Sequence, residues 1–103
     1  MKYTYLFPYE KIPQGARIII YGAGDVGQEY LQQLLMTGYA EAICFLDRAY
    51  DRYPAMVIPV LPPDKVADLN FDYVVIAMKT SVFCGDIVSF LEKVEFREKE
   101  SFI

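Results

Sequence analysis

The chain has 103 residues, which is enough for one small domain with a single hydrophobic core. Hydrophobic residues make up 54% of it, so disorder is not expected. Histidine is absent, which excludes a Ser-His-Asp triad and any histidine metal ligand. The two cysteines, Cys44 and Cys84, form no CxxC pair, so neither a zinc site nor a disulfide framework is predicted, and a reducing compartment is expected.

Charge and hydropathy also limit the partners of the chain. Its net charge of −4 argues against nucleic acid as a partner, because proteins that bind nucleic acids normally present a basic face. No apolar run approaches the roughly 20 residues that span a bilayer. The N-terminus does not resemble a signal peptide. We therefore expect a soluble, cytoplasmic protein with no membrane partner.

Two apolar runs, at residues 17–21 and 42–47, have the composition of strands buried on both faces, which is typical of a parallel sheet. Between them, the apolar residues of 25–37 recur at steps of three and four and predict an amphipathic helix, which Gly38 ends. The polar residues between the apolar positions are Gln28, Glu29, Gln32 and Gln33. The residues expected on the inward face are Val26, Tyr30, Leu31, Leu34 and Leu35.

The rest of the chain continues the alternation of strands and helices. Residues 56–60 predict a short third strand, near an edge of the sheet because Pro59 lacks a backbone donor. A short helix from residue 62, a last strand at 73–77 and a helix from Ser81 to about residue 94 follow. The order β-α-β-β-α-β-α predicts a small open parallel α/β sheet with right-handed crossovers and the strand order 3-2-1-4.

Both ends of the chain lie outside this unit of residues 17–94. Residues 1–16 form an aromatic N-terminal lead, and residues 95–103 form a charged C-terminal tail. The lead either packs over the edge of the sheet or serves as an interface for a second copy of the chain. The sequence favours neither of these two roles over the other.

A glycine-rich turn joins the first strand to the first helix. Gly22, Gly24 and Gly27 match GxGxxG, in which the first glycine permits a tight turn, the second admits a pyrophosphate to the backbone, and the third lets the helix pack closely on the sheet. The helix N-terminus offers free N–H groups to an anion. A strand before and a helix after the motif are typical of the dinucleotide-binding Rossmann fold. The residues predicted on the phosphate side are Gly22, Ala23, Gly24, Asp25, Val26 and Gly27.

An acid follows this turn at the spacing that such folds require. Asp47 lies 20 residues after Gly27, at the end of the second strand, where a carboxylate can accept hydrogen bonds from two ribose hydroxyls. The acid favours NAD over NADP, but the neighbouring Arg48 could either pair with Asp47 or reach a 2′-phosphate. Asp25 weakens the prediction, because its charge would repel a phosphate. Alternatively, the glycines serve only the turn and the packing, and Asp47 is a solvated acid.

A second loop is expected at the same edge of the sheet. Lys79 and Thr80 follow the last strand, where ligands of open α/β sheets bind. Lys79 could meet a phosphate or a carboxylate there, and Thr80 could donate a hydrogen bond. A solvated lysine followed by Ser81 as a helix cap is the favoured alternative, because serine caps helices well. We predict no metal site and no catalytic residue, since no base lies beside a nucleophile and no carboxylates are paired.

Three segments, residues 17–27, 45–47 and 71–77, together give a resemblance to a known group of modules. Residues 14–78 resemble the small Rossmann-like modules at the N-terminus of bacterial surface-polysaccharide enzymes. These enzymes include nucleotide-sugar epimerase/dehydratases, sugar O-acyltransferases and proteins associated with FkbM-type methyltransferases. The resemblance implies NAD or a nucleotide sugar as the ligand, with Gly22, Gly24, Gly27 and Asp47 on the ligand side.

We therefore expect a non-catalytic module that binds NAD(H) or a nucleotide sugar and is part of, or accessory to, a bacterial carbohydrate-modifying enzyme. Its catalytic domain would lie outside this chain. One alternative is a ligand-free interaction module that forms a homodimer through residues 3–9 or the sheet edge. Another is a fragment of an NAD-dependent nucleotide-sugar epimerase/dehydratase or dehydrogenase, because a complete dinucleotide fold has about six strands and this chain supplies roughly half of them.

Overall fold

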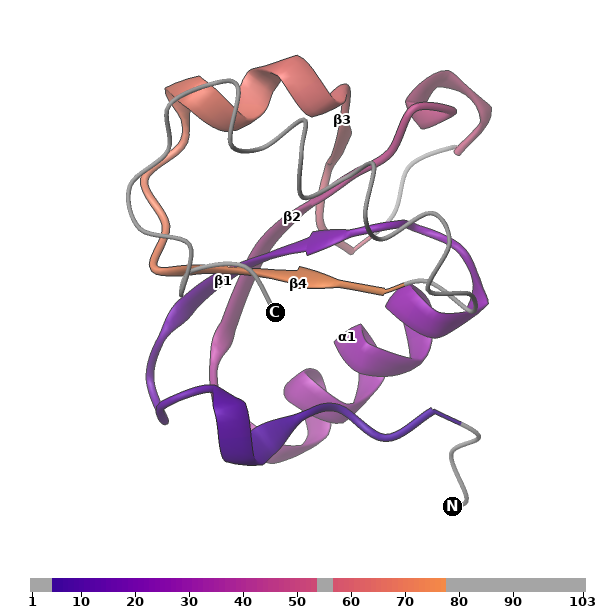
Figure 1. The fold of residues 1–103 in the computed structure, drawn as a ribbon. Coiled ribbons are helices and arrows are strands. Elements are labelled where there is room, and N and C mark those ends of the chain that lie inside the picture. The colour runs from indigo at the N-terminus through magenta and orange to yellow at the C-terminus, as the bar shows by residue number, and fades with distance from the viewer. Residues whose placement is uncertain (1–4, 54–56, 78–103) are drawn as a thin grey trace.

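The computed structural model describes residues 5–53 and 57–77 (Figure 1). Four strands form one parallel sheet in the order β3-β2-β1-β4, which confirms the predicted α/β architecture and strand order. The strands are β1 (Arg17–Tyr21), β2 (Glu41–Leu46), β3 (Val60–Leu61) and β4 (Tyr73–Ile76). The helices are α1 (Asp25–Thr37) and the 3-10 helices η1 (Tyr9–Lys11), η2 (Tyr50–Arg52) and η3 (Pro63–Asp68).

Helix α1 spans the residues that the sequence periodicity predicts. Gly38 follows it in the left-handed conformation, with φ at 65°, and its N–H donates to the carbonyl of Leu34 at 2.8 Å. A residue without a Cβ adopts this conformation at no steric cost, so glycine ends the helix here. The helix then leads directly into β2, which lies beside β1.

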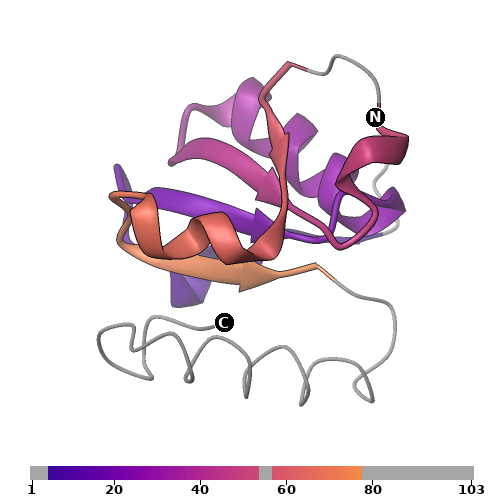
Figure 2. The same cartoon turned by 90° about the horizontal axis from the view of Figure 1, so that it is seen from above.

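The sheet has two buried faces, and side chains alternate between them along each strand. In β1, Ile18 and Ile20 point toward α1, whereas Ile19 and Tyr21 belong to the core on the other face. That other face is covered by η3 and the loop after it, with Val66 fully buried. Figure 1 shows α1 and η3 on opposite sides of the sheet, and Figure 2 shows β1 and β4 running side by side.

The described part of the N-terminal lead packs against α1. Phe7 is 1% exposed, and its backbone N–H donates to the side-chain oxygen of Gln33 at 3.0 Å. The amide nitrogen of Gln33 donates in turn to the carbonyl of Tyr5 at 2.7 Å, and Glu29 accepts the N–H of Tyr5 at 3.0 Å. These contacts show that the lead packs within its own chain, although against α1 rather than over the edge of the sheet as predicted. Helix α1 is therefore covered by the sheet on one side and by the lead on another.

At two positions of α1, burial differs from what the helical periodicity predicts. The periodicity places Leu35 on the inward face, but this residue is 58% exposed. It places Gln33 among the polar residues, but this residue is buried. The prediction was wrong at both positions. Gln33 is buried because the lead covers its side of the helix and supplies backbone groups that a glutamine can pair with.

The third strand is shorter and begins later than predicted. The sequence predicts residues 56–60, but β3 is Val60–Leu61, and Val57 is 74% exposed. Pro59 has no N–H and contributes only its carbonyl, which accepts the N–H of Phe45 at 2.9 Å. Pairing with β2 therefore begins at the proline. The short helix predicted from residue 62 is present as η3.

The helix predicted from Ser81 and the tail of residues 95–103 lie outside the described residues. Within the two described ranges, none of the helices combines the length and the apolar character needed to cross a membrane.

Candidate functional site

The glycine turn lies at the carboxyl end of the sheet, between β1 and α1. Gly22 has φ at 112°, a backbone conformation that residues with a side chain rarely adopt. Its N–H donates to the carbonyl of Leu46 at 2.7 Å, which fastens the start of the turn to the end of β2. Gly24 is the N-cap residue of α1. The turn therefore places the first N–H groups of α1 at the edge of the sheet where parallel α/β folds bind ligands.

The second and third glycines of the motif have different surroundings. A Cβ on Gly27 would collide with the carbonyl oxygen of Gly22 and lie 3.2 Å from Cε1 of Phe45. A Cβ on Gly24 would meet no heavy atom within 4 Å. Gly27 thus permits close packing of the helix on the sheet, whereas Gly24 borders open space at the helix N-terminus. Packing explains why position 27 requires glycine, but it places no such requirement on position 24.

Asp47 turns its carboxylate toward the glycine turn. One carboxylate oxygen, Oδ2, accepts the N–H of Ala23 at 2.9 Å, and the other, Oδ1, accepts the N–H of Ala49 at 2.8 Å. The side chain is half-buried. An ionised carboxylate has about four acceptor positions, so these two bonds leave about two for other donors. The acid is therefore fixed beside the turn and can still accept hydrogen bonds from hydroxyl groups.

The first turn of α1 adds a charge and a polar side chain. Asp25 is the first residue of the helix and is exposed. Its carboxylate stabilises the positive end of the helix dipole but lowers the attraction of that end for an anion. Gln28, which the sequence analysis did not assign to the site, donates from its side-chain nitrogen to the carbonyl of Ala23 at 3.0 Å. Val26 is buried in the core.

Tyr53 is a second residue near the turn that the sequence analysis missed. Burial raises the pKa of its phenol, and the carboxylates of Asp47 and Asp25 raise this pKa further, so the phenol lies within the field of both acids. Its ring packs against the α1 side of the core. Its position in the loop shortly after Asp47 is the one sequence signal that could have identified it.

Arg48 lines a pocket of about 460 Å³ at the carboxyl ends of β1 and β3. The other residues that line it are Tyr21, Pro62, Pro63 and Asp64. Burial raises the pKa of Tyr21, while the nearby Arg48 guanidinium lowers it. The pocket therefore brings together the guanidinium of Arg48, the carboxylate of Asp64 and the phenol of Tyr21.

Lys79 and Thr80, the remaining two predicted site residues, lie outside the described residues. Among the residues that are described, no three histidine, cysteine, aspartate or glutamate side chains come together in a way that could hold a metal ion.

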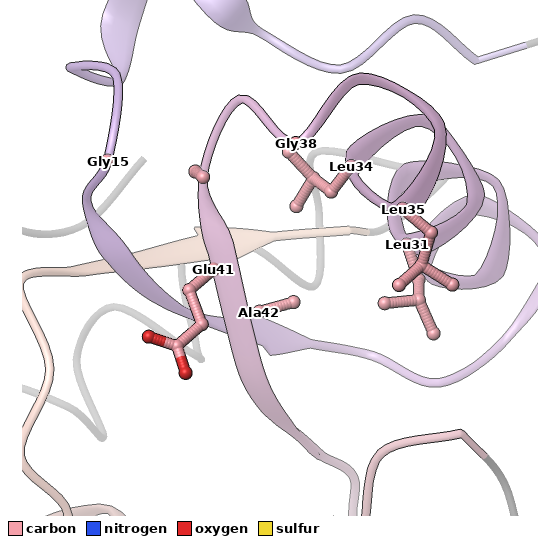
Figure 3. A pocket seen from close by; sticks show the side chains of 8 residues that line it. Gly15, Leu31, Leu34, Leu35, Gly38, Glu41 and Ala42 are labelled. Carbon is pink, nitrogen blue, oxygen red and sulfur yellow. The ribbon is translucent and has the colours of Figure 1, made fainter.

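A hollow of about 360 Å³ lies at the opposite, amino end of the sheet, between α1 and the start of β2 (Figure 3). Leu31, Leu34 and Leu35 line its helix side, and the carboxylate of Glu41 lies on the far side of β2 from them. Strand β3 pairs only with the last two residues of β2, so within the described residues the start of β2 has no strand on the side away from β1. This mainly apolar hollow is not part of the glycine-turn site.

The family model described as C2185-like, N-terminal matches residues 14–101. The chain belongs to the C2185-like N-terminal family. No curated protein matches it in sequence.

Solved structures show which fold this C2185-like domain shares. A UDP-D-quinovosamine 4-dehydrogenase from Vibrio fischeri is similar with a TM-score of 0.66 and 20% identity, over 78% of this chain and 72% of that one. RSP, a Rex-family repressor, is similar with a TM-score of 0.60 and 16% identity, over 81% of this chain and 43% of that one. RSP in complex with β-NAD+ and operator DNA has a TM-score of 0.57 and 15% identity, over 80% and 41%. The chain thus spans less than half of each repressor chain, and these similarities show a Rossmann-like fold.

Proposed function

We propose that this C2185-like domain is a non-catalytic module that binds NAD(H) or a nucleotide sugar at the turn between β1 and α1. The observation that carries the proposal is the open space at Gly24, directly at the N-terminus of α1 and beside the carboxylate of Asp47. A diphosphate would lie at the N-terminus of α1, where the helix dipole is positive and backbone N–H groups point out of the helix. The remaining acceptor positions of Asp47 would bind the ribose hydroxyls.

The similar structures support a nucleotide as the ligand. One is named as a dehydrogenase of a UDP-sugar, and another holds β-NAD+. We also propose that the module serves a cytoplasmic carbohydrate-modifying enzyme, as the resemblance to the modules of surface-polysaccharide enzymes implies. A catalytic domain outside this chain would then be its partner, since the residues around the glycine turn include no base beside a nucleophile.

Titration of the chain with NAD+, NADP+ and UDP-glucose, followed by thermal unfolding and calorimetry, tests the proposal. A ligand at 100 times its dissociation constant should stabilise the fold by about 2.7 kcal/mol. Gly24→Val should abolish this stabilisation, because the branched side chain would occupy the phosphate position. The fold itself should lose only about 1 kcal/mol, since the position is open and valine merely makes a poorer N-cap than glycine.

The matched control is Gln32→Val, which places the same side chain at an exposed position of α1 outside the glycine turn. This variant should bind as the wild type does. Wild-type affinity in Gly24→Val would show that the ligand lies elsewhere. No binding of any of the three nucleotides by the wild type would reject the nucleotide-binding function.

The role of Asp47 is tested separately with Asp47→Asn, which keeps an oxygen for one of the two backbone N–H groups but removes the charge. Binding should weaken by about 1–3 kcal/mol, the range for hydrogen bonds to charged groups. An unchanged dissociation constant in calorimetry would remove Asp47 from the site.

Self-association is a second candidate function, and the amino end of the sheet favours it. Leu35 and Met36 are 58% and 67% exposed, and Leu35 borders the hollow beside the start of β2 (Figure 3). Exposed apolar side chains beside a strand edge are typical of protein interfaces. Light scattering should then report a dimer that Leu35→Lys dissociates. A monomeric wild type would reject this function.

A further inference from the structure

Tyr21 is the last residue of β1 and lies under the glycine turn on the sheet face opposite α1. Its side chain is 4% exposed, yet its hydroxyl has no hydrogen-bond partner among the residues that the structure describes. A buried polar atom without a partner is costly, so native proteins keep few of them. The hydroxyl therefore requires an explanation that packing alone does not supply.

Arg48 is the side chain that can provide this partner. It lines the same pocket as Tyr21, and it is close enough to lower the pKa of the phenol against the larger upward effect of burial. No hydrogen bond of standard geometry joins the two groups. The arginine is exposed and carries five N–H donors, so its guanidinium can turn to donate to the phenol oxygen.

The charges of the pocket favour the same position for Arg48. Asp64 lines the pocket with it, and the carboxylate of Asp47 acts on the same phenol as the guanidinium does. A phosphate that entered this region would meet those two negative charges. It would also draw Arg48 away from the hydroxyl of Tyr21, which would again be buried without a partner.

From this arrangement we propose that Tyr21 is a positioning residue that holds the guanidinium of Arg48 in the pocket between the ends of β1 and β3. The nucleotide site then selects a ribose with a free 2′-hydroxyl and discriminates against a 2′-phosphate. This inference rests on the proposed nucleotide-binding function and specifies its ligand as NAD(H) over NADP(H).

Calorimetric dissociation constants for NAD+ and NADP+ test the inference, with the ratio of the two as the readout. The wild type should bind NAD+ at least about tenfold more tightly than NADP+. Tyr21→Phe frees Arg48 to reach a 2′-phosphate, so the ratio should fall by about tenfold, as expected for loss of a hydrogen bond that involves a charged group. Tyr50→Phe, the same change at an exposed tyrosine, should leave the ratio unchanged.

Repeating Tyr21→Phe in an Arg48→Gln background separates positioning from a merely structural role. Tyr21→Phe should then have no effect on the ratio, because the side chain that it positions is gone. An effect of equal size in both backgrounds would overturn the proposal, since Tyr21 would then act without Arg48.

The remaining outcomes distinguish this inference from the proposed function. If the wild type prefers NAD+ and Tyr21→Phe keeps the same ratio, the role of Tyr21 is wrong and nucleotide binding stands. If the wild type binds UDP-glucose but neither dinucleotide, the 2′ selectivity is likewise wrong and nucleotide binding stands. If the wild type binds none of the three, both proposals fail.

Discussion

On one face of the sheet, the 13-residue helix α1 packs so closely that Gly27 contacts the backbone of Gly22. The core residues between this helix and the sheet are apolar, and the buried Gln33 bonds to the lead instead. On the other face, the short helix η3 covers the strands, and two groups with polar chemistry are enclosed. They are the thiol of Cys44, which is 1% exposed, and the phenol of Tyr21.

The difference shows that the two faces of the sheet have different roles in this small domain. The α1 face defines the fold, because it combines a long helix, a close backbone contact and the added layer of the lead. The η3 face encloses groups that can titrate or form hydrogen bonds, and it ends at the pocket beside the glycine turn. Substitutions in the core of the first face should therefore act mainly on stability, whereas substitutions of the enclosed groups on the second face should act on pH dependence and on the preference between ligands.

Gly27→Ala should have the largest effect on stability and tests the close packing of α1 on the sheet. The added methyl group would collide with the carbonyl of Gly22, which belongs to the backbone and cannot rotate away. We expect the free energy of unfolding to fall by more than about 3 kcal/mol, at the upper end for overpacking. Denaturant unfolding monitored by circular dichroism measures this loss.

Gly24→Ala is the matched control in the same turn. A Cβ there meets no atom within 4 Å, so the loss should stay near 1 kcal/mol or less. Equal losses at the two glycines would contradict the proposed division of the motif into a packing residue and a ligand-side residue.

The pH dependence of stability tests the second face. Burial raises the pKa of Cys44 from 9.0 to about 11. The unfolded chain therefore releases the thiol proton at a lower pH than the folded chain does, so this contribution is fully present below about pH 9 and is lost as the pH rises toward 11. We expect unfolding experiments to show a fall of roughly 2 kcal/mol between about pH 8 and about pH 10.5.

Cys44→Ala serves as the reference for this measurement, because it keeps the other ionisable groups, including Tyr21 and Tyr53, whose raised pKa values act in the same direction. The variant should lack the part of the alkaline decline that belongs to the thiol. Identical pH profiles for the two proteins would mean that Cys44 is not effectively buried in solution.

The architecture could be predicted from the sequence because it depends on local signals. The β-branched run at residues 17–21, the helical periodicity that ends at Gly38, and the turn between them each reflect the physics of a single element. The strand order followed from the handedness of crossovers, which holds for nearly all parallel sheets. The spacing of the motif predicts an acid at the end of the second strand, and the carboxylate of Asp47 indeed faces the glycine turn.

What the sequence could not reveal depends on contacts between distant segments. Gln33 is polar and lies between apolar positions, so nothing local indicates that it bonds to residues 26 and 28 positions away. The pocket at Arg48 likewise requires Tyr21 and the prolines after β3, which only the folded chain brings together. Periodicity identifies the face of a helix that meets the sheet, but it contains no information about a second covering layer.

Gln33→Met tests that second layer and has a smaller expected effect. Methionine keeps much of the side-chain volume but leaves the N–H of Phe7 without its acceptor and the carbonyl of Tyr5 without a donor. We expect a loss of about 1–2 kcal/mol in urea unfolding, the range for buried groups that lose their hydrogen bonds. Gln32→Met, at the neighbouring exposed position, should change stability by less than about 0.5 kcal/mol.

Tyr21→Phe should have the smallest effect on stability, although it is fully enclosed. Its hydroxyl has no partner among the described residues, and the bond proposed with Arg48 involves an exposed side chain that can pair with water instead, so its removal should cost the fold little. The free energy of unfolding should stay within about 0.5 kcal/mol of the wild type, or rise. Tyr39→Phe on the α1 face provides the contrast, because its hydroxyl donates to the carbonyl of Ile12 at 2.6 Å, and its loss should cost about 1 kcal/mol. A larger loss for Tyr21→Phe than for Tyr39→Phe would mean that the phenol on the η3 face stabilises the fold itself, and the contrast between the two faces would not hold.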